Sequence, residues 1–182
     1  MQRAASRCAM KYIPALLFAL AFPPAAWAGP VEDNIARGRE ALAARDAVKA
    51  MEAFTAALEA DPRNVEAAYE RGQLLLVIGQ PQYAIADFTT AALGDPTFGR
   101  AYVGRARAKL MLNNVKSATA DFDKAIAVAP KDFEVHVARA ALRARTGDVP
   151  GARADLENAK AVADEATARN IDEMLKTLPA TP

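Results

Sequence analysis

The sequence predicts an all-α protein, a solenoid of four helical hairpins with a capping helix at its C-terminal end. Three observations lead to this fold class. Alanine is the most common residue, and it carries the smallest helix penalty of any amino acid. Valine, isoleucine and threonine are too sparse to supply a large β-sheet. Similar residues also recur every 34 positions, and a period of this length is typical of a solenoid.

The first predicted element is an export segment, residues 1–28. Three basic side chains and no acidic one precede an apolar stretch at residues 12–22. The tripeptide that ends at Ala28 has the small-residue pattern of a signal-peptide cleavage site. We expect a secretory signal peptide cleaved after Ala28, and a periplasmic or secreted protein with no stable membrane insertion after cleavage. A retained membrane anchor is the alternative.

Charge and cysteine content exclude several classes of function. The chain has 23 lysine and arginine residues against 22 acidic residues, so no charge excess favours a nucleic-acid partner. Cys8 is the single cysteine of the sequence, and it lies in the predicted signal peptide. The cleaved form is therefore expected to lack disulfides, thiolate metal sites and thiol redox chemistry, and its fold depends on packing alone.

After the signal peptide, four copies of 34 residues follow one another at 31–64, 65–98, 99–132 and 133–166. Each copy contains two helical stretches, and residues that tolerate turns separate them. Each copy is therefore predicted to be a helical hairpin. Three columns of residues define the period: Ala50, Ala84, Ala118 and Ala152; Phe54, Phe88, Phe122 and Leu156; and Pro62, Pro96 and Pro130.

Small residues mark the place where the two helices of each hairpin are expected to meet. Such residues stand at the eighth position of every copy, as Gly38, Gly72, Ala106 and Ala140. We expect them to let the paired helices approach closely, while the aromatic column fills the space beside the crossing. A larger side chain at the eighth position would overpack the hairpin.

These columns resemble the tetratricopeptide repeat family, and the resemblance covers residues 31–166. It implies a right-handed α-solenoid in which the first helices of successive hairpins line a concave surface and the second helices form the convex back. The fourth copy departs from the family pattern at Leu156 and Asp164. A large aromatic at the fourth position of a copy is present in this sequence as Tyr102 alone.

A further helix is predicted at residues 167–178, followed by a short tail at residues 179–182. The segment resembles the solvating helix that ends many such arrays. A terminal cap is expected because the end of a solenoid otherwise exposes apolar surface. One apolar face at helical spacing is formed by Ile171, Met174, Leu175 and Leu178.

Two charged columns suggest a repeated ion pair. Arginine stands at the seventh position of every copy, and aspartate stands at the twenty-third position of copies two to four. Pairing with the preceding copy gives fewer pairs than pairing within a copy, because Ala53 would face an arginine. We interpret the columns as structural pairs, and a ligand role for the arginines is the alternative. The predicted pairs are Arg71 with Asp87, Arg105 with Asp121, and Arg139 with Asp155.

The resemblance places the binding surface on the concave face. Tyrosine and arginine dominate many interfaces, so these residue types lead the candidates among the inward positions. For apolar positions, packing between repeats is the alternative. The lysine and asparagine clamp with which some family members hold a peptide C-terminus is missing, which disfavours a chaperone-tail adaptor. The predicted partner-binding residues are Arg39, Tyr69, Gln73, Arg100, Val103, Arg107 and Met111.

The sequence predicts no catalytic site, no metal site and no cofactor. His136 is the single histidine and is interpreted as a packing residue, and the sequence has no nucleophile elbow or phosphate-binding loop. We expect a non-catalytic periplasmic scaffold that binds a protein or peptide partner of the cell envelope in its concave groove. The alternative is an accessory subunit of an envelope enzyme or of a secretion or assembly complex, docked through its convex face or array ends.

Overall fold

The computed structural model describes residues 29–179, and within that range it contains nine α-helices and no strand. This confirms the predicted all-α fold class. The predicted signal peptide, residues 1–28, and residues 180–182 of the predicted tail lie outside the described residues. The helices are α1 (Pro30–Ala43), α2 (Ala47–Ala60), α3 (Val65–Val77), α4 (Pro81–Gly94), α5 (Gly99–Met111), α6 (Val115–Val128), α7 (Phe133–Arg145), α8 (Val149–Val162) and α9 (Glu165–Thr177).

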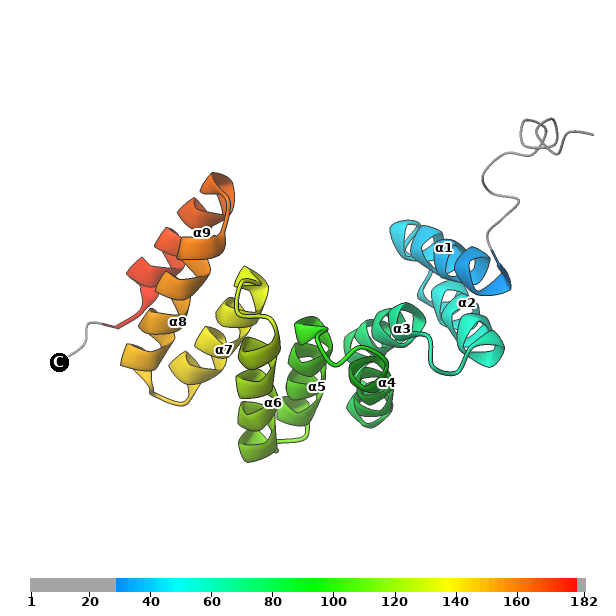
Figure 1. Ribbon diagram of the computed structural model, residues 1–182, viewed down its shortest axis with the longest axis horizontal. Helices are drawn as coiled ribbons and strands as arrows, with labels where there is room; N and C mark the ends of the chain where they lie inside the picture. The colour runs from blue at the N-terminus through cyan, green and yellow to red at the C-terminus, as the bar shows by residue number, and fades with distance from the viewer. Residues whose placement is uncertain (1–28, 180–182) are drawn as a thin grey trace, which may run out of the picture.

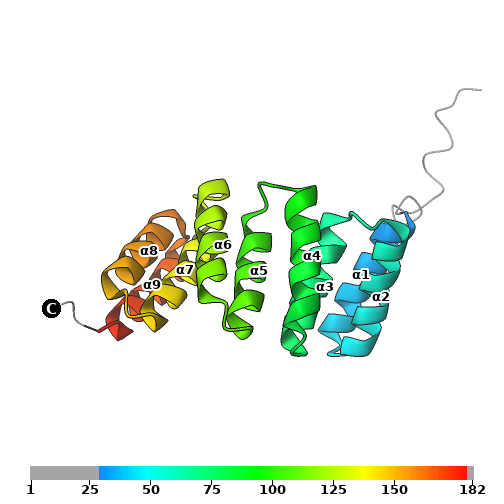
Figure 2. The same cartoon turned by 90° about the horizontal axis from the view of Figure 1, so that it is seen from below.

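The helices pair into hairpins that stack into one curved row (Figure 1). Helix α1 packs against α2, α3 against α4, α5 against α6 and α7 against α8, and α9 closes the row against α8. Helix α5 also contacts α3 and α7, so the first helices of the hairpins lie side by side along the inner curve. Figure 2 shows the row running from α1 and α2 at one end to α8 and α9 at the other.

Each hairpin turn contains one residue in the left-handed conformation. Gly79 (φ 76°) and Gly147 (φ 86°) adopt it without a side-chain clash, and Arg45 and Asn113 adopt it at φ 59°. The next residue along the chain stands directly before the second helix. In the first turn this residue is Asp46, whose carboxylate accepts a backbone N–H of that helix at 3.1 Å and satisfies one of its free donors. The turn residues of the sequence are thus a left-handed residue followed by a helix cap.

One phenylalanine fills the space between the helices in each of the first three hairpins. Phe54 and Phe88 are fully buried, and Phe122 is 1% exposed. A Cβ atom added to Gly38 would lie 2.5 Å from the ring of Phe54. A Cβ atom added to Gly72 would lie 2.9 Å from the ring of Phe88. In the first two hairpins a larger residue than glycine would therefore force a shift of the ring or the helix, whereas the third hairpin accommodates Ala106 opposite Phe122.

The capping helix begins before residue 167, where the sequence analysis started it. Helix α9 begins at Glu165 and ends at Thr177. The reason is Asp164, whose carboxylate accepts a backbone N–H of the first turn at 2.8 Å. Asp164 occupies the position of proline in the earlier copies, so the residue that departs from the repeat pattern starts the cap. Ile171 and Leu175 bury one face of α9 against the fourth hairpin.

Candidate functional site

The arginine and aspartate columns form two-pronged ion pairs within the second, third and fourth hairpins. Arg71 Nε and Nη2 donate to the two carboxylate oxygens of Asp87, both at 2.7 Å. This geometry is the strongest that an arginine and a carboxylate can adopt. These are the pairs that the 34-residue period predicts. The same contact joins Arg105 to Asp121 at 2.9 and 2.8 Å, and Arg139 to Asp155 at 3.0 and 2.7 Å.

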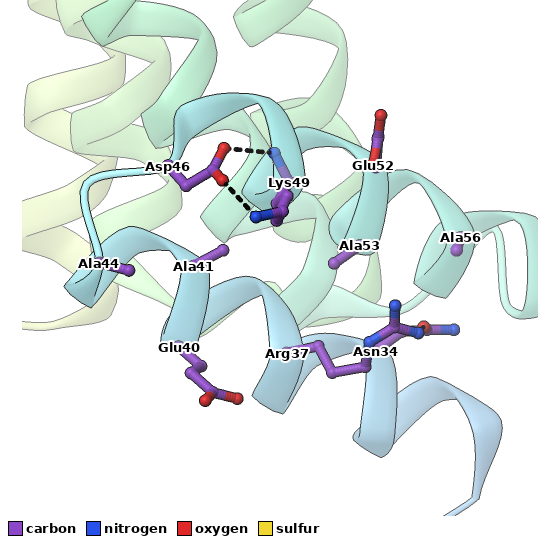
Figure 3. A pocket seen from close by; sticks show the side chains of 10 residues that line it. All are labelled: Asn34, Arg37, Glu40, Ala41, Ala44, Asp46, Lys49, Glu52, Ala53 and Ala56. Atoms are coloured by element: carbon purple, nitrogen blue, oxygen red, sulfur yellow. Dashed lines mark hydrogen bonds and ion pairs between the residues drawn. The ribbon is translucent and has the colours of Figure 1, made fainter.

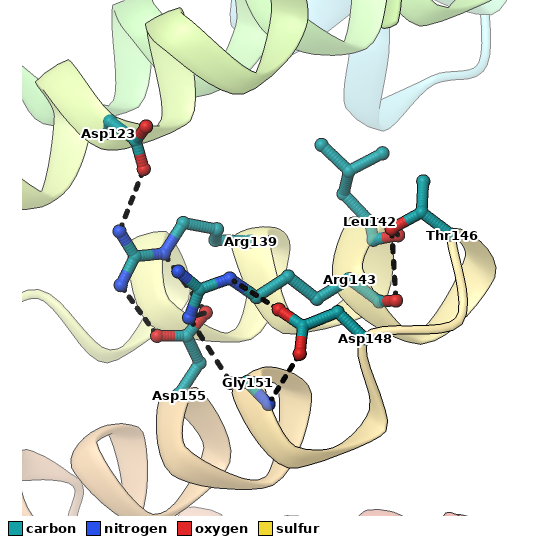
Figure 4. A network of polar contacts seen from close by, with 8 residues as sticks. All are labelled: Asp123, Arg139, Leu142, Arg143, Thr146, Asp148, Gly151 and Asp155. Atoms are coloured by element: carbon teal, nitrogen blue, oxygen red, sulfur yellow. Dashed lines mark hydrogen bonds and ion pairs between the residues drawn. The ribbon is translucent and has the colours of Figure 1, made fainter.

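The third nitrogen of each guanidinium reaches the second helix of the preceding hairpin. One side chain therefore connects three helices, and we call this contact the arginine staple. Figure 4 shows the staple of the fourth repeat, in which Arg139 lies between Asp155 and Asp123. The contacts of Nη1 are Arg71 to Thr55 Oγ1 at 3.4 Å, Arg105 to Thr89 Oγ1 at 3.3 Å, and Arg139 to Asp123 Oδ1 at 2.9 Å.

The staple aspartates are buried, so they depend on complete pairing. Asp121 accepts a second contact from Lys109 at 2.7 Å, and Asp155 accepts one from Arg143 at 3.0 Å. Hydrogen bonding to the aspartates is the main cause that raises the pKa of all three staple arginines above the ordinary value of arginine. These arginines are committed to holding the array together and offer no free charge to a partner.

Two of the predicted groove arginines are also paired, Arg39 with the next repeat and Arg100 with one carboxylate of its own repeat and one of the next. The sequence analysis did not identify their acidic partners. A signal was available, because two of the carboxylates stand at the second position of the next copy, one of the inward positions. The pairs are Arg39 with Glu66 at 2.6 Å and with Glu70 at 2.8 Å, and Arg100 with Asp132 at 2.9 Å and with Glu134 at 3.2 Å.

Five of the seven predicted partner-binding residues meet at one small cavity on the inner side of the curve. Helices α3 and α5 supply Tyr69, Gln73, Arg100, Val103 and Arg107 to its lining. The cavity has a volume of about 60 Å³. This is room for about two water molecules, so a side chain of a partner has to replace water rather than fill an empty pocket. We call this site the groove cavity.

The groove cavity is lined by the Tyr69 ring, the Gln73 amide, two arginines and the carboxylate of Glu134, which pairs with Arg100. Gln73 Nε2 donates to the hydroxyl oxygen of Tyr69 at 3.0 Å, and the Tyr69 ring packs edge-on against Phe98 at 4.9 Å. Burial raises the pKa of the Tyr69 hydroxyl, which keeps this group neutral at physiological pH. Arg107 is exposed and makes no hydrogen bond or ion pair with residues 29–179. It is therefore the positive charge that the groove cavity offers.

Two of the predicted partner-binding residues lie outside the groove cavity, and a third is part of the hydrophobic core. Met111 is the last residue of α5, is 52% exposed and lies outside the groove cavity, as does Arg39. Val103 is 6% exposed and belongs to the hydrophobic core, so it forms the floor of the cavity. For Val103 the structure therefore supports the alternative of packing between repeats.

An apolar hollow that the sequence analysis did not identify lies on the outer side, over α2 and the turn after α3. It has a volume of about 530 Å³, and Val48, Met51 and Ile78 contribute its apolar lining. Met51 also lines an adjoining hollow together with Tyr83. Val48 and Tyr83 are 69% and 67% exposed. These residues belong to no repeated column, and for that reason the period gave no signal for this convex hollow.

His136 has a structural role that matches that of Tyr102 one copy earlier. His136 Nε2 lies 2.8 Å from the carbonyl oxygen of Pro130, and the Tyr102 hydroxyl donates to the carbonyl oxygen of Pro96 at 3.4 Å. Both side chains tie a first helix to the end of the repeat before it.

Across residues 29–179, no cluster of three or more histidine, cysteine or acidic side chains is arranged to hold a metal ion. No helix in this range is long and apolar enough to cross a membrane.

Comparison with known proteins gives one family and a set of similar folds. A family model described as tetratricopeptide repeat matches the chain twice, at residues 35–102 and 103–170. The crystal structure of a thermophilic tetratricopeptide repeat protein from Thermus thermophilus is 22% identical to this chain. The match covers 80% of both chains, with a TM-score of 0.70. Comparison with curated protein sequences gave no match.

Two further structures resemble shorter parts of the array. The Arabidopsis OM64 tetratricopeptide repeat domain is 29% identical over 63% of this chain and 98% of that domain, with a TM-score of 0.59. The first such domain of Spaghetti (RPAP3), solved bound to the HSP90 peptide SRMEEVD, is 20% identical. That match covers 66% of this chain and 94% of the domain, with a TM-score of 0.59.

Replacement of a staple aspartate tests the structural assignment of the charged columns. In Asp121→Ala, Arg105 and Lys109 lose their shared carboxylate in a largely buried setting. We expect the free energy of unfolding, measured by urea titration with circular dichroism, to fall by about 3–5 kcal/mol. The control is Lys124→Ala on the same helix, whose exposed side chain makes no ion pair with residues 29–179 and is expected to contribute at most about 0.5 kcal/mol. Equal losses in the two variants would contradict the assignment.

Proposed function

Because the chain belongs to the tetratricopeptide repeat family, we propose that it is a non-catalytic scaffold of the cell envelope that binds an acidic segment of a partner protein in its concave groove. The observation that carries this proposal is the groove cavity, where Tyr69 and Gln73 lie beside Arg107. Aromatic and guanidinium groups are the side chains that contribute most binding energy at protein interfaces. The groove cavity therefore has the chemistry of a recognition site for a peptide segment.

The charge of the groove determines which segment fits. Arg39 and Arg100 are neutralised by nearby carboxylates, whereas Arg107 has no such partner among residues 29–179. A guanidinium binds a carboxylate through charge-assisted hydrogen bonds. We assign the Arg107 contact to an acidic side chain of the partner, and the Tyr69 ring to an apolar side chain next to it. The domain of Spaghetti (RPAP3) bound to SRMEEVD supports the binding of peptides by this fold.

The envelope location rests on the amino-terminal segment. Residues 1–28 combine a basic start, an apolar stretch and a small-residue cleavage pattern ending at Ala28. This segment lies outside the described residues, so its support is the sequence pattern alone. A scaffold that is exported in this way would meet partners of the periplasm or of the extracellular medium.

The convex hollow favours a second candidate function, that of an accessory subunit docked permanently through its outer side. Val48, Ile78 and Tyr83 are exposed apolar side chains near the N-terminal half of the array. An obligate partner would cover such residues, since contiguous exposed apolar surface marks interaction sites. A partner lost in Val48→Asp and Tyr83→Asp variants, but retained when the groove is changed, would select this candidate over the groove.

Charge reversal in the groove tests the proposed function. The probe is an array of short acidic peptides, each with a matched version in which aspartate and glutamate are replaced by asparagine and glutamine. We expect wild-type protein to prefer the acidic versions, and Arg107→Glu to weaken that binding by roughly tenfold or more, about 1.4 kcal/mol, measured by fluorescence anisotropy.

The control for this experiment is Lys124→Glu, which makes the same charge change at an exposed position of α6 on the outer side. This variant is expected to bind the peptides as wild type does. A wild-type protein that treats acidic and amide peptides alike would refute the assignment of Arg107. Equal losses in both variants would indicate a net-charge effect instead of a site.

The export assignment has its own test. Replacement of the small residue before the expected cleavage site, Ala28→Tyr, is expected to block processing, because that position requires a small side chain. Intact mass spectrometry of the wild-type protein from the envelope fraction is expected to give a chain that starts at Gly29. The variant is expected to keep residues 1–28. An unprocessed wild-type chain in the cytosolic fraction would contradict the envelope location.

A further inference from the structure

At the N-terminal end of the array, α1 and α2 form a face that no other element of residues 29–179 covers. A hollow of about 550 Å³ lies there between the two helices. Ala41 and Ala53 point into the space between the helices, and Arg37 lies on the α1 side (Figure 3). Glu52 lines the same hollow from the α2 side. We call this surface the N-terminal face.

In the later repeats, the second helix of the hairpin before covers the equivalent face. Helix α2 packs on α3, α4 on α5 and α6 on α7. The covering helix also supplies an oxygen to the staple arginine, as Thr55 does for Arg71. Within residues 29–179 no helix precedes α1, so the N-terminal face has neither the cover nor the oxygen that every later repeat receives.

The staple of the first repeat is incomplete for a second reason. Arg37 stands at the staple position, but Ala53 replaces the aspartate that would face it. Its hydrogen bond within residues 29–179 is to Asn34 Oδ1, at 3.3 Å. Arg37 therefore lacks the carboxylate that the arginines of repeats two to four share with their own hairpin.

The same face carries acidic groups that are also unpaired. Glu40 and Glu52 both line the hollow and make no ion pair with residues 29–179. Lys49 forms its ion pair with Asp46 at 2.9 Å and interacts with Glu52 only more weakly, as a minor cause that raises the Lys49 pKa. One face thus presents a free positive charge and free negative charges around an alanine floor. A surface that holds both signs is complementary to itself, as a two-fold interface requires.

We propose that the N-terminal face is the interface of a two-fold dimer in which Arg37 of each chain pairs with Glu52 of the partner. A two-fold axis along the groove between α1 and α2 lays the partner's α2 over α1, in the place that the second helix of a preceding repeat occupies. Residues at positions seven and twenty-three of a repeat lie opposite one another at the same height along the two paired helices, as the ion pair of Arg71 and Asp87 shows. Residue 53 therefore lies level with Arg37, and the partner's Glu52 comes next to that guanidinium.

The alanine side chains of the hollow are small enough for the partner's α2 to pack closely over α1. Ala41 and Ala53 are 8% and 7% exposed and form the floor of the hollow, with the longer side chains of Arg37, Glu40 and Glu52 around it. Small side chains at a helix crossing let the backbones come close. The two pairs of Arg37 with the partner's Glu52, one at each edge, then fix the register of the two chains.

Sedimentation equilibrium of the purified protein, between about 1 and 100 µM, tests the dimer because its population depends on concentration. We expect wild type to associate to a dimer. Arg37→Glu and Glu52→Arg each place like charges opposite one another twice in the dimer. Each variant alone is therefore expected to weaken association by about tenfold or more. Circular dichroism establishes that both variants fold, and Lys124→Glu controls for the change in net charge.

A mixture of the two variants gives the decisive result. One chain of the mixed dimer carries two acidic groups at these positions and the other carries two basic groups, so both contacts become attractive. We expect the equimolar mixture to dimerise like wild type. A monomeric wild type, a dimer insensitive to Arg37→Glu, or a mixture that stays monomeric would each overturn the proposal. A different protein that binds wild-type monomer but not Arg37→Glu would reassign the face to that protein.

Discussion

A guanidinium that joins three helices is the interaction on which the rest of the array depends. Each staple arginine binds the aspartate of its own hairpin with two nitrogens and an oxygen of the preceding hairpin with the third. The first contact holds a hairpin together, and the second orients neighbouring hairpins. Because the aspartates are buried, loss of an arginine would leave a buried carboxylate without its main partner and destabilise the hairpin.

The staple also determines which charges are available for function. The arginines at the staple position of repeats two to four are held in structural pairs, and Arg39 and Arg100 are paired with nearby carboxylates. Two of the cations that form no ion pair among residues 29–179 lie at the surfaces discussed above. Arg107 lies in the groove, and Arg37 lies on the N-terminal face. The unpaired Arg107 thus favours an acidic segment in the groove, and the unpaired Arg37 favours a second copy on the N-terminal face.

Sequence predicted the fold well because the fold is periodic. The 34-residue columns identify the hairpins, and they also select Arg105 and Asp121 as neighbours, since a contact between equivalent positions repeats in every copy. Contacts that do not repeat were missed. The pairing of Arg39 with Glu66 depends on how two long side chains extend between repeats, and the convex hollow at Val48 arises from residues unique to one hairpin.

Hydrogen exchange of the staple variant Arg105→Met, which keeps the apolar stem and removes the guanidinium, tests the central claim most directly. The control is Arg107→Met on the same helix, where no ion pair is lost among residues 29–179. The account predicts faster amide exchange in α5 and α6 and also in α4, the helix of the preceding hairpin, because the staple spans all three. Faster exchange limited to α5 and α6, or equal effects of the two variants, would contradict a staple that connects successive repeats.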